Sequence, residues 1–152
     1  MTFGSPKWQP WVLDSSASLP LLKHAFDLGI NTWDTADIYS HGDSEKIIAN
    51  AIEHYKLPRK KLVIMTKCFF PVSVDGEQPP FDMSVKNAGS VVNSMGLSRK
   101  HIFDAVEDST SRLGTYIDVL QIHRLDRDTD KEEIMRALND VIASGKGMRH
   151  ML

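Results

Sequence analysis

The sequence predicts an α/β fold in which parallel strands alternate with helices. Four stretches carry the i, i+3, i+4 apolar spacing of helices that pack one face on a core. Short apolar runs that are too brief for helices lie between them. The two kinds of segment alternate from Phe3 to Gly145. This order is typical of right-handed βαβ units, which place helices over a parallel sheet.

The composition predicts one ordinary globular domain over residues 1–152. The chain is 41% hydrophobic and 25% charged, which is enough apolar material for a core. The net charge is -2, and lysines and arginines are scattered among acids, so we do not expect a nucleic-acid partner. The single cysteine, Cys68, cannot form an internal disulfide. No apolar run approaches the roughly 20 residues needed to cross a bilayer, and no signal peptide is visible. We therefore expect no membrane partner and a cytoplasmic location.

Each expected helix has a start signal and an end signal. The helices are expected after Ser18, near Ser44, from Ser98 and from Asp130. At the last of these, Glu133 stands where a capping box has its glutamate. The end signals are Gly29, Pro58, Gly114 and Gly145.

The expected strands are the short apolar runs that precede these helices. They are the segments 1–3, 30–33, 62–65 and 117–122. A long irregular segment, 69–97, follows the third of them and contains three prolines and three glycines. A loop that follows a strand of a parallel sheet lies on the ligand-binding side, which favours a functional loop. A plain surface insertion is an equally weighted alternative.

Ionisable side chains follow three of the expected strands. Asp34 and Tyr39 follow the strand at 30–33, Lys67 follows the strand at 62–65, and His123 follows the strand at 117–122. Taken singly, each is more often a solvated or structural residue at a strand end. The carboxyl ends of parallel strands lie side by side, however, so residues far apart in sequence can converge on one crevice.

A set of this kind can polarise and protonate a carbonyl oxygen. A lysine cation stabilises a neighbouring tyrosinate, so Lys67 could make Tyr39 a better proton donor. Asp34 would hold the ammonium of Lys67, and His123 could donate a hydrogen bond to the carbonyl oxygen. Because no side chain gives hydride, reduction would require a nicotinamide cofactor. No metal-ligand spacing and no glycine-rich phosphate loop occurs in the sequence.

Three segments of the chain resemble aldo-keto reductases. They are NTWDTADIY at 31–39, VIMTK at 63–67 and YIDVLQIH at 116–123, and they occur in the family's order. The similarity continues at 96–103 and 144–146, so it covers nearly the whole chain. The longer spacing between Lys67 and His123 is most similar to the fungal aryl-alcohol dehydrogenase, or yakc-like, branch.

The resemblance implies a fold, a reaction and four catalytic residues. The fold would be part of a (β/α)8 barrel, with about four βα units. The reaction would transfer hydride from NADPH to an aldehyde or ketone, and Tyr39 would protonate the forming alkoxide. Asp34, Lys67 and His123 would complete the catalytic set, and Asp34 would also lie near the nicotinamide ribose.

The resemblance also implies that much of the family's barrel has no counterpart in these 152 residues. Such barrels have about 250 residues or more, and the family binds most of its cofactor through strands five to eight. The segment after Lys146 diverges from the family's fifth strand. We therefore expect a truncated aldo-keto reductase domain that binds NADPH weakly and leaves two sheet edges open.

Two alternatives stay open beside that of an active reductase. The first is a non-catalytic remnant that acts as an interaction or subunit-like module, for which a homodimer through the open sheet edges could close the sheet. The second is a self-sufficient α/β domain that binds a nucleotide at a switch point, although the sequence lacks the glycine-rich fingerprint of such domains.

Overall fold

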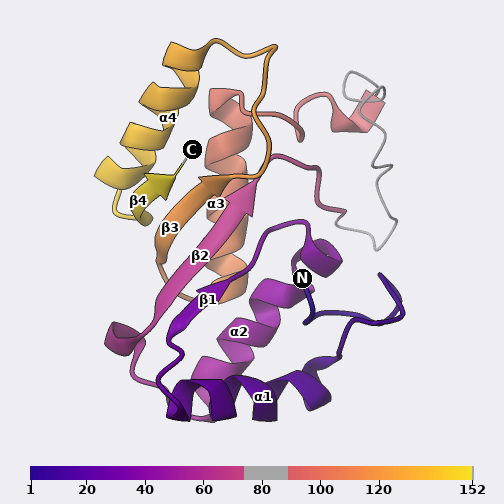
Figure 1. Ribbon diagram of the computed structural model, residues 1–152. Helices are drawn as coiled ribbons and strands as arrows, with labels where there is room; N and C mark the ends of the chain where they lie inside the picture. Colours follow the sequence, from indigo (N-terminus) through magenta and orange to yellow (C-terminus); the bar gives the residue numbers. More distant parts are fainter. Residues whose placement is uncertain (74–88, 152) are drawn as a thin grey trace.

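The structure is a computed structural model that describes residues 1–73 and 89–151. At its centre lies a parallel sheet with the strand order β1-β2-β3-β4 (Figure 1). The strands are β1 (Thr32–Asp34), β2 (Val63–Cys68), β3 (Ile117–Ile122) and β4 (Gly147–Met151). Every neighbouring pair is parallel, with Trp33 opposite Ile64 and Thr66 opposite Leu120. The predicted α/β class is confirmed.

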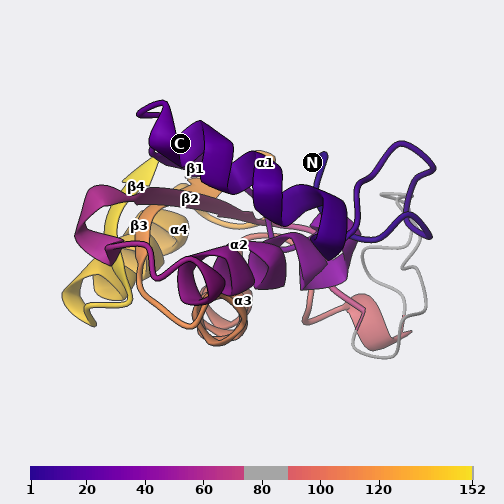
Figure 2. The same ribbon diagram turned by 90° about the horizontal axis from the view of Figure 1, so that it is seen from below.

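Within the described residues, helices and short 3-10 turns precede and connect these strands. They are α1 (Ser15–Asp27), η1 (Tyr39–Gly42), α2 (Asp43–His54), η2 (Arg59–Lys61), η4 (Gly89–Val91), α3 (Arg99–Leu113) and α4 (Lys131–Ala143). Figures 1 and 2 show α2 and α3 together on one face of the sheet. Figure 2 shows α1 on the other side of the strands, beside β1, and the central part of the face seen in Figure 1 carries no helix of the described residues.

The side chains that alternate along β2 explain where the core lies. Ile64, Thr66 and Cys68 are buried, whereas the residues between them are only partly buried. The buried set faces the helices and packs with fully buried residues from α3 and α4, among them Ile102, Ala137 and Leu138. A period of two is what a pleated strand imposes when one of its two faces is covered.

The helix starts agree with the sequence except at α1 and, by one residue, α2. Ser98 caps α3, and Asp130 caps α4 by accepting from the amides of Glu132 and Glu133. The start expected after Ser18 is wrong, because Asp14 caps α1 and accepts from the Ala17 amide at 3.0 Å. Ser18 is buried inside the helix, and its hydroxyl donates to the Asp14 carbonyl oxygen.

The reciprocal half of the capping box at α4 is not formed. The carboxylate of Glu133 accepts a hydrogen bond from the backbone amide of Arg99 at 2.9 Å. It therefore ties the start of α4 to the start of α3. A longer-range donor has replaced the local one that a capping box would use.

Both ends of the expected sheet differ from the prediction. The segment 1–3 is not a strand of the sheet, because Phe3 makes only an isolated bridge to Leu13. Beyond Lys146, where no strand was predicted, the chain forms β4, which pairs Gly147 with Ile117. Strand pairing uses backbone groups, so it does not depend on a particular set of side chains.

The long loop predicted at 69–97 is anchored at both ends. Phe69 and Leu97 are buried in the core, and the Gly96 amide donates to the Phe69 carbonyl oxygen at 2.8 Å. Residues 74–88, the middle of the predicted loop, lie outside the described residues.

None of the described helices has the length and apolarity that crossing a lipid bilayer requires.

The cap of α4 gives a direct test of the fold. Asp130→Ala removes the acceptor for two amides at the helix start, which are 2.8 and 3.3 Å from Asp130 Oδ1. We expect the free energy of unfolding to fall by about 1 kcal/mol, measured by urea denaturation. Asp130→Asn keeps an oxygen at this position and should retain nearly all of the stability. Equal losses in the two variants would contradict the capping role.

Candidate active site

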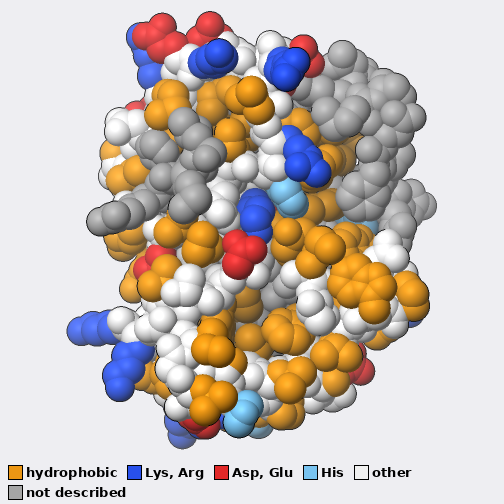
Figure 3. Space-filling model, viewed as in Figure 1, with side chains coloured by type: hydrophobic (Ala, Val, Ile, Leu, Met, Phe, Trp, Pro, Cys, Tyr) orange, Lys and Arg blue, Asp and Glu red, His pale blue; other side chains and the backbone are white. Residues whose placement is uncertain are grey.

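Three strand ends and one turn supply the polar side chains on the open face of the sheet. Asp34 is the last residue of β1, Lys67 lies near the end of β2, and His123 directly follows β3. Tyr39 begins the turn η1 beyond β1. Figure 3 views this face and shows acidic, basic and histidine side chains gathered at its centre among hydrophobic ones. The convergence predicted from the sequence is present.

Lys67 is held in place by two acceptors. Its Nζ lies 2.6 Å from Asp34 Oδ2 and 2.7 Å from the carbonyl oxygen of Thr35. The Lys67 side chain is 14% exposed, whereas that of Asp34 is 51% exposed. A charge-assisted pair of this length is stronger than a neutral hydrogen bond, so the ammonium is fixed beneath an accessible carboxylate.

Tyr39 lies between Lys67 and His123. Lys67 Nζ is 5.1 Å from the centroid of the Tyr39 ring, within the range of a cation–π contact. The His123 ring meets the Tyr39 ring edge-on, with centroids 5.6 Å apart and planes at 86°. Tyr39 is 9% exposed, so the ring is enclosed by its neighbours. All four predicted site residues are therefore brought together.

His123 is a neutral imidazole at pH 7. Burial, followed by the charges of Lys67 and Arg124, lowers its pKa from 6.5 to about 4, against a smaller opposing effect of Asp34. Its backbone amide donates to the Cys68 carbonyl oxygen at 3.0 Å, which fixes the residue at the end of β2. Its Nδ1 is buried and has no hydrogen-bond partner among the described residues.

The sequence missed the aromatic wall around this group. Phe70 contacts the His123 ring at a centroid distance of 5.2 Å, and Trp8 contacts Tyr39 at 6.2 Å. Phe70 could have been found, because it lies two residues beyond β2 on the same side of the sheet as the other site residues. Trp8 gives no such signal, since it belongs to the segment before α1 that only the tertiary fold brings to the site.

A cavity of about 280 Å³ adjoins Asp34 at the β1 end of the sheet. It is lined mainly by apolar side chains, including those of Leu22, Ile30 and Trp33. No group of three or more His, Cys, Asp or Glu side chains within 1–73 and 89–151 is arranged to hold a metal ion. The polar groups that the four site residues offer are one ammonium, one phenol, one imidazole and one carboxylate.

Comparison with known proteins decides the family. The family model described as "Aldo/keto reductase family" matches residues 1–149. The chain belongs to the aldo-keto reductase family. It is 58% identical over 147 residues to the versiconal hemiacetal acetate reductase of Aspergillus parasiticus. It is 50% identical over 153 residues to a Schizosaccharomyces pombe protein named as an aryl-alcohol dehydrogenase. The predicted family and its fungal relatives are confirmed.

The match covers only part of each relative. It includes 96% of this chain but 43% of the Aspergillus protein and 47% of the Schizosaccharomyces protein. A solved structure, the holo form of the aldo-keto reductase AKR11C1 from Bacillus halodurans, superposes with a TM-score of 0.74 at 26% identity. It matches 90% of this chain and 41% of that one. The four-stranded sheet thus corresponds to part of an aldo-keto reductase barrel.

The titration of His123 can be measured directly. Its pKa in the folded chain is about 4, below the ordinary 6.5, so folding opposes protonation of the ring. Between pH 6.5 and pH 4 the unfolded chain binds a proton at this ring more readily than the folded chain does. The free energy of unfolding therefore falls as the pH is lowered from 6.5 towards 4 and is unaffected by this ring above pH 6.5. We expect the His123 ring signals in an NMR titration to change with a midpoint near pH 4.

The same effect should appear in urea denaturation. His123→Asn should reduce the loss of stability between pH 6.5 and pH 4, because the ring that resists protonation is gone. His24→Asn, on the exposed surface of α1, is the matched control and should keep the wild-type difference. A His123 midpoint at or above 6.5 would show that the ring is not desolvated.

Proposed function

We propose that this chain carries the catalytic residues of a carbonyl reductase that transfers hydride from NADPH to an aldehyde or ketone. One observation carries the proposal: the Tyr39 ring contacts both the Lys67 ammonium and the His123 ring, whose lowered pKa makes it neutral at pH 7. A phenol in this place can protonate an oxygen while a cation stabilises the phenolate that remains. The family supports the same reaction.

Each of the four residues has a separate role in this proposal. Asp34 holds the Lys67 ammonium, and that ammonium stabilises the negative charge that Tyr39 acquires when its hydroxyl proton leaves. His123 donates a hydrogen bond from its neutral ring to the carbonyl oxygen of the substrate and so orients it. Tyr39 then delivers its proton to the oxygen of the forming alkoxide.

Two features of the site fit a nicotinamide cofactor. The Asp34 carboxylate is half exposed at the mouth, where it can accept a hydrogen bond from a ribose hydroxyl while it holds Lys67. His123 Nδ1 is a buried polar atom that lacks a partner among the described residues. Bound NADPH would supply the hydride. The similar bacterial structure, of which this chain matches 41%, is described as a holo form.

An aromatic carbonyl compound is the substrate class that the surroundings favour. Tyr39 and Phe70 place two aromatic rings against His123, and Trp8 packs against Tyr39 in turn. Aromatic rings attract one another edge-on as well as by apolar burial. A relative named as an aryl-alcohol dehydrogenase is half identical in sequence. We also place the chain in the cytoplasm, where the buried free thiol of Cys68 would remain reduced.

The catalytic proposal is tested by the loss of the phenolic hydroxyl. The assay follows reduction of benzaldehyde as the loss of NADPH absorbance, at NADPH concentrations high enough for a weakly bound cofactor. Tyr39→Phe should lower the rate by roughly 100- to 10,000-fold, because it removes the proton donor. Tyr55→Phe, at the far end of α2, is the matched control and should leave the rate unchanged. Full activity of Tyr39→Phe would exclude this residue as the acid.

The open edges of the sheet favour a second role, in which the chain acts by association. In the described part of the chain, β1 pairs only with β2, and β4 pairs only with β3. Unpaired edges of parallel strands are templates for a further strand. A twofold pair of chains could set β4 of each copy beside β1 of the other and give eight parallel strands, the number in a closed barrel of this class.

A single backbone group tests this association. The β2 side of β1 is bonded through Asn31 and Thr35, so alternation directs the Thr32 amide to the open edge. We expect the 152-residue chain to sediment as a dimer at micromolar concentration. Thr32→Pro should shift it to monomer by removing that donor, whereas Thr32→Val keeps the amide and should remain dimeric. A wild-type monomer at these concentrations would contradict the pairing.

A further inference from the structure

The turn that carries Tyr39 has a backbone conformation that ordinary residues rarely adopt. In η1, Ser40 and His41 have φ angles of 51° and 50°, and Gly42 follows at 89°. A left-handed conformation costs a residue with a side chain roughly 1–2 kcal/mol. Two such residues in succession persist only when neighbouring segments hold them. The orientation of Tyr39 therefore depends on what packs against residues 40–42.

The segment before α1 makes the first set of contacts that stabilise this turn. The Ser5 amide donates to Ser40 Oγ at 3.0 Å. Gly4 lies directly against the same side chain, and a Cβ at this glycine would be 2.5 Å from Ser40 Cβ. Only a glycine permits this approach, so the segment before α1 closes on one side of the turn.

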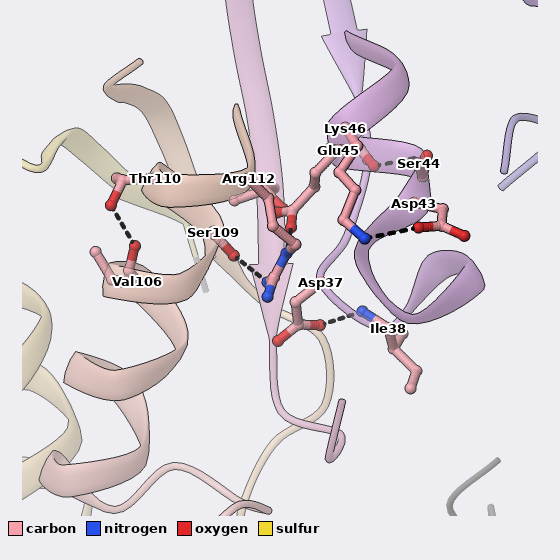
Figure 4. Close-up of polar contacts among 12 residues, drawn as sticks. Asp37, Ile38, Asp43, Ser44, Glu45, Lys46, Val106, Ser109, Thr110 and Arg112 are labelled. Carbon is pink, nitrogen blue, oxygen red and sulfur yellow. Dashed lines mark hydrogen bonds and ion pairs between the residues drawn. The ribbon is translucent and has the colours of Figure 1, made fainter. Parts of the chain in front are cut away.

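Helix α3 makes the second set of contacts that stabilise this turn. The side chain of Arg112 passes over Gly42 so closely that a Cβ at this glycine would be 2.6 Å from Arg112 Nε. Arg112 Nε donates to Glu45 Oε2 at 2.6 Å, and its Nη2 donates to Ser109 Oγ at 3.1 Å (Figure 4). The arginine is thereby fixed at its guanidinium end while its stem covers the turn.

Glu45 is the fixed point of this arrangement. The residue has no exposed surface, and its second oxygen, Oε1, accepts from the Thr66 hydroxyl at 2.6 Å. A buried carboxylate needs a cation and full hydrogen bonding, and here both oxygens are bonded. Because Thr66 directly precedes Lys67 in β2, Glu45 links the strand that bears Lys67 to the arginine that covers the turn bearing Tyr39.

Asp37 does not compete for this arginine. Its carboxyl group is 1% exposed, and its Oδ1 accepts from the Ile38 amide at 2.6 Å (Figure 4). Burial, followed by the nearby charge of Glu45, raises the pKa of Asp37 well above its usual value. The charge of Arg112 opposes this shift only as a smaller effect, and the ion pair that Arg112 forms is with Glu45.

We propose that Glu45 and Arg112 are positioning residues, whose ion pair behind the sheet clamps the turn 39–42 and keeps the Tyr39 ring between Lys67 and His123. Neither residue touches the reacting groups. Only the expected effect of this ion pair on catalysis, and not its effect on the turn, rests on the proposed function. Its structural effect is measurable on the folded chain without cofactor or substrate.

The test compares two ion pairs of the same length. Arg112→Met removes the clamp but keeps an apolar stem. Arg59→Met is the matched control, because Arg59 lies 2.6 Å from Asp118 and is as little exposed as Arg112, 16% against 15%. Arg59 binds the Leu62 and Tyr116 carbonyl oxygens at the opposite end of β2 and β3. Both variants should lose stability, and only one should disturb the turn.

Amide hydrogen exchange and NMR of the Tyr39 ring are the readouts. The His41 amide donates to Ile38 and the Asp43 amide to Tyr39 and Ser40, so both report on the turn. In Arg112→Met we expect both amides to exchange roughly tenfold faster or more, and the contacts between the Tyr39 and His123 ring protons to weaken. Arg59→Met should leave these local signals as in the wild type.

A second variant covers the case in which Arg112→Met fails to fold. Glu45→Gln with Arg112→Met removes both charges, which avoids an unpaired buried carboxylate while still releasing the turn. Unchanged turn exchange in this variant, or equal changes in Arg59→Met, would overturn the clamp.

Turnover separates the clamp from the function on which it rests. If the wild type reduces benzaldehyde, the Arg112 variant should lose kcat roughly tenfold or more with little change in KM, because a displaced proton donor affects the chemical step. An unchanged kcat would overturn the clamp. A wild type without turnover would count against the proposed reductase, while the exchange result would still decide the clamp.

Discussion

Strand β2 joins the two sides of the site because its successive side chains point to opposite faces of the sheet. Lys67 lies on the open face and binds Asp34, while Thr66 lies on the helix face and binds Glu45. One residue of register thus separates the group that supports proton transfer from the group that anchors the layer behind it. A slip of one residue in β2 would exchange the two faces and destroy both arrangements.

Burial sets the chemistry of the open face. A carboxylate and a carbonyl oxygen bind the Lys67 ammonium, whereas the buried Nδ1 of His123 has no such partner among the described residues and burial lowers the pKa of that ring. A protonated His123 would stand beside Lys67 as a second cation and would compete for the carboxylate of Asp34. The lowered pKa of His123 therefore preserves the ion pair, and with it the cation nearest to Tyr39.

The residues that the sequence predicted are those whose positions follow from local pattern. Asp34, Lys67 and His123 stand at or next to the ends of apolar runs, and parallel pairing brings such ends together. Tyr39 lies five residues beyond Asp34 in a turn with left-handed residues, and the lysine expected beside it suggested a role as proton donor that the family resemblance also implies. The resemblance also gave the barrel class, since alternation of strands and helices alone is shared by other α/β folds.

The sequence did not predict the contacts between distant segments. Glu45 and Arg112 are 67 residues apart, and Trp8 reaches Tyr39 from before the first helix. Neither pair has a local pattern, because the packing of α2 on α3 and of the first segment on the turn creates it. The cap of α1 is a local feature that was predicted wrongly: the Asp14 carboxylate reaches the Ala17 amide, and the Ser18 hydroxyl donates to the Asp14 carbonyl oxygen instead of capping the helix. The clamp is thus a property of tertiary packing, and it forms behind β2 whatever covers the open face in front.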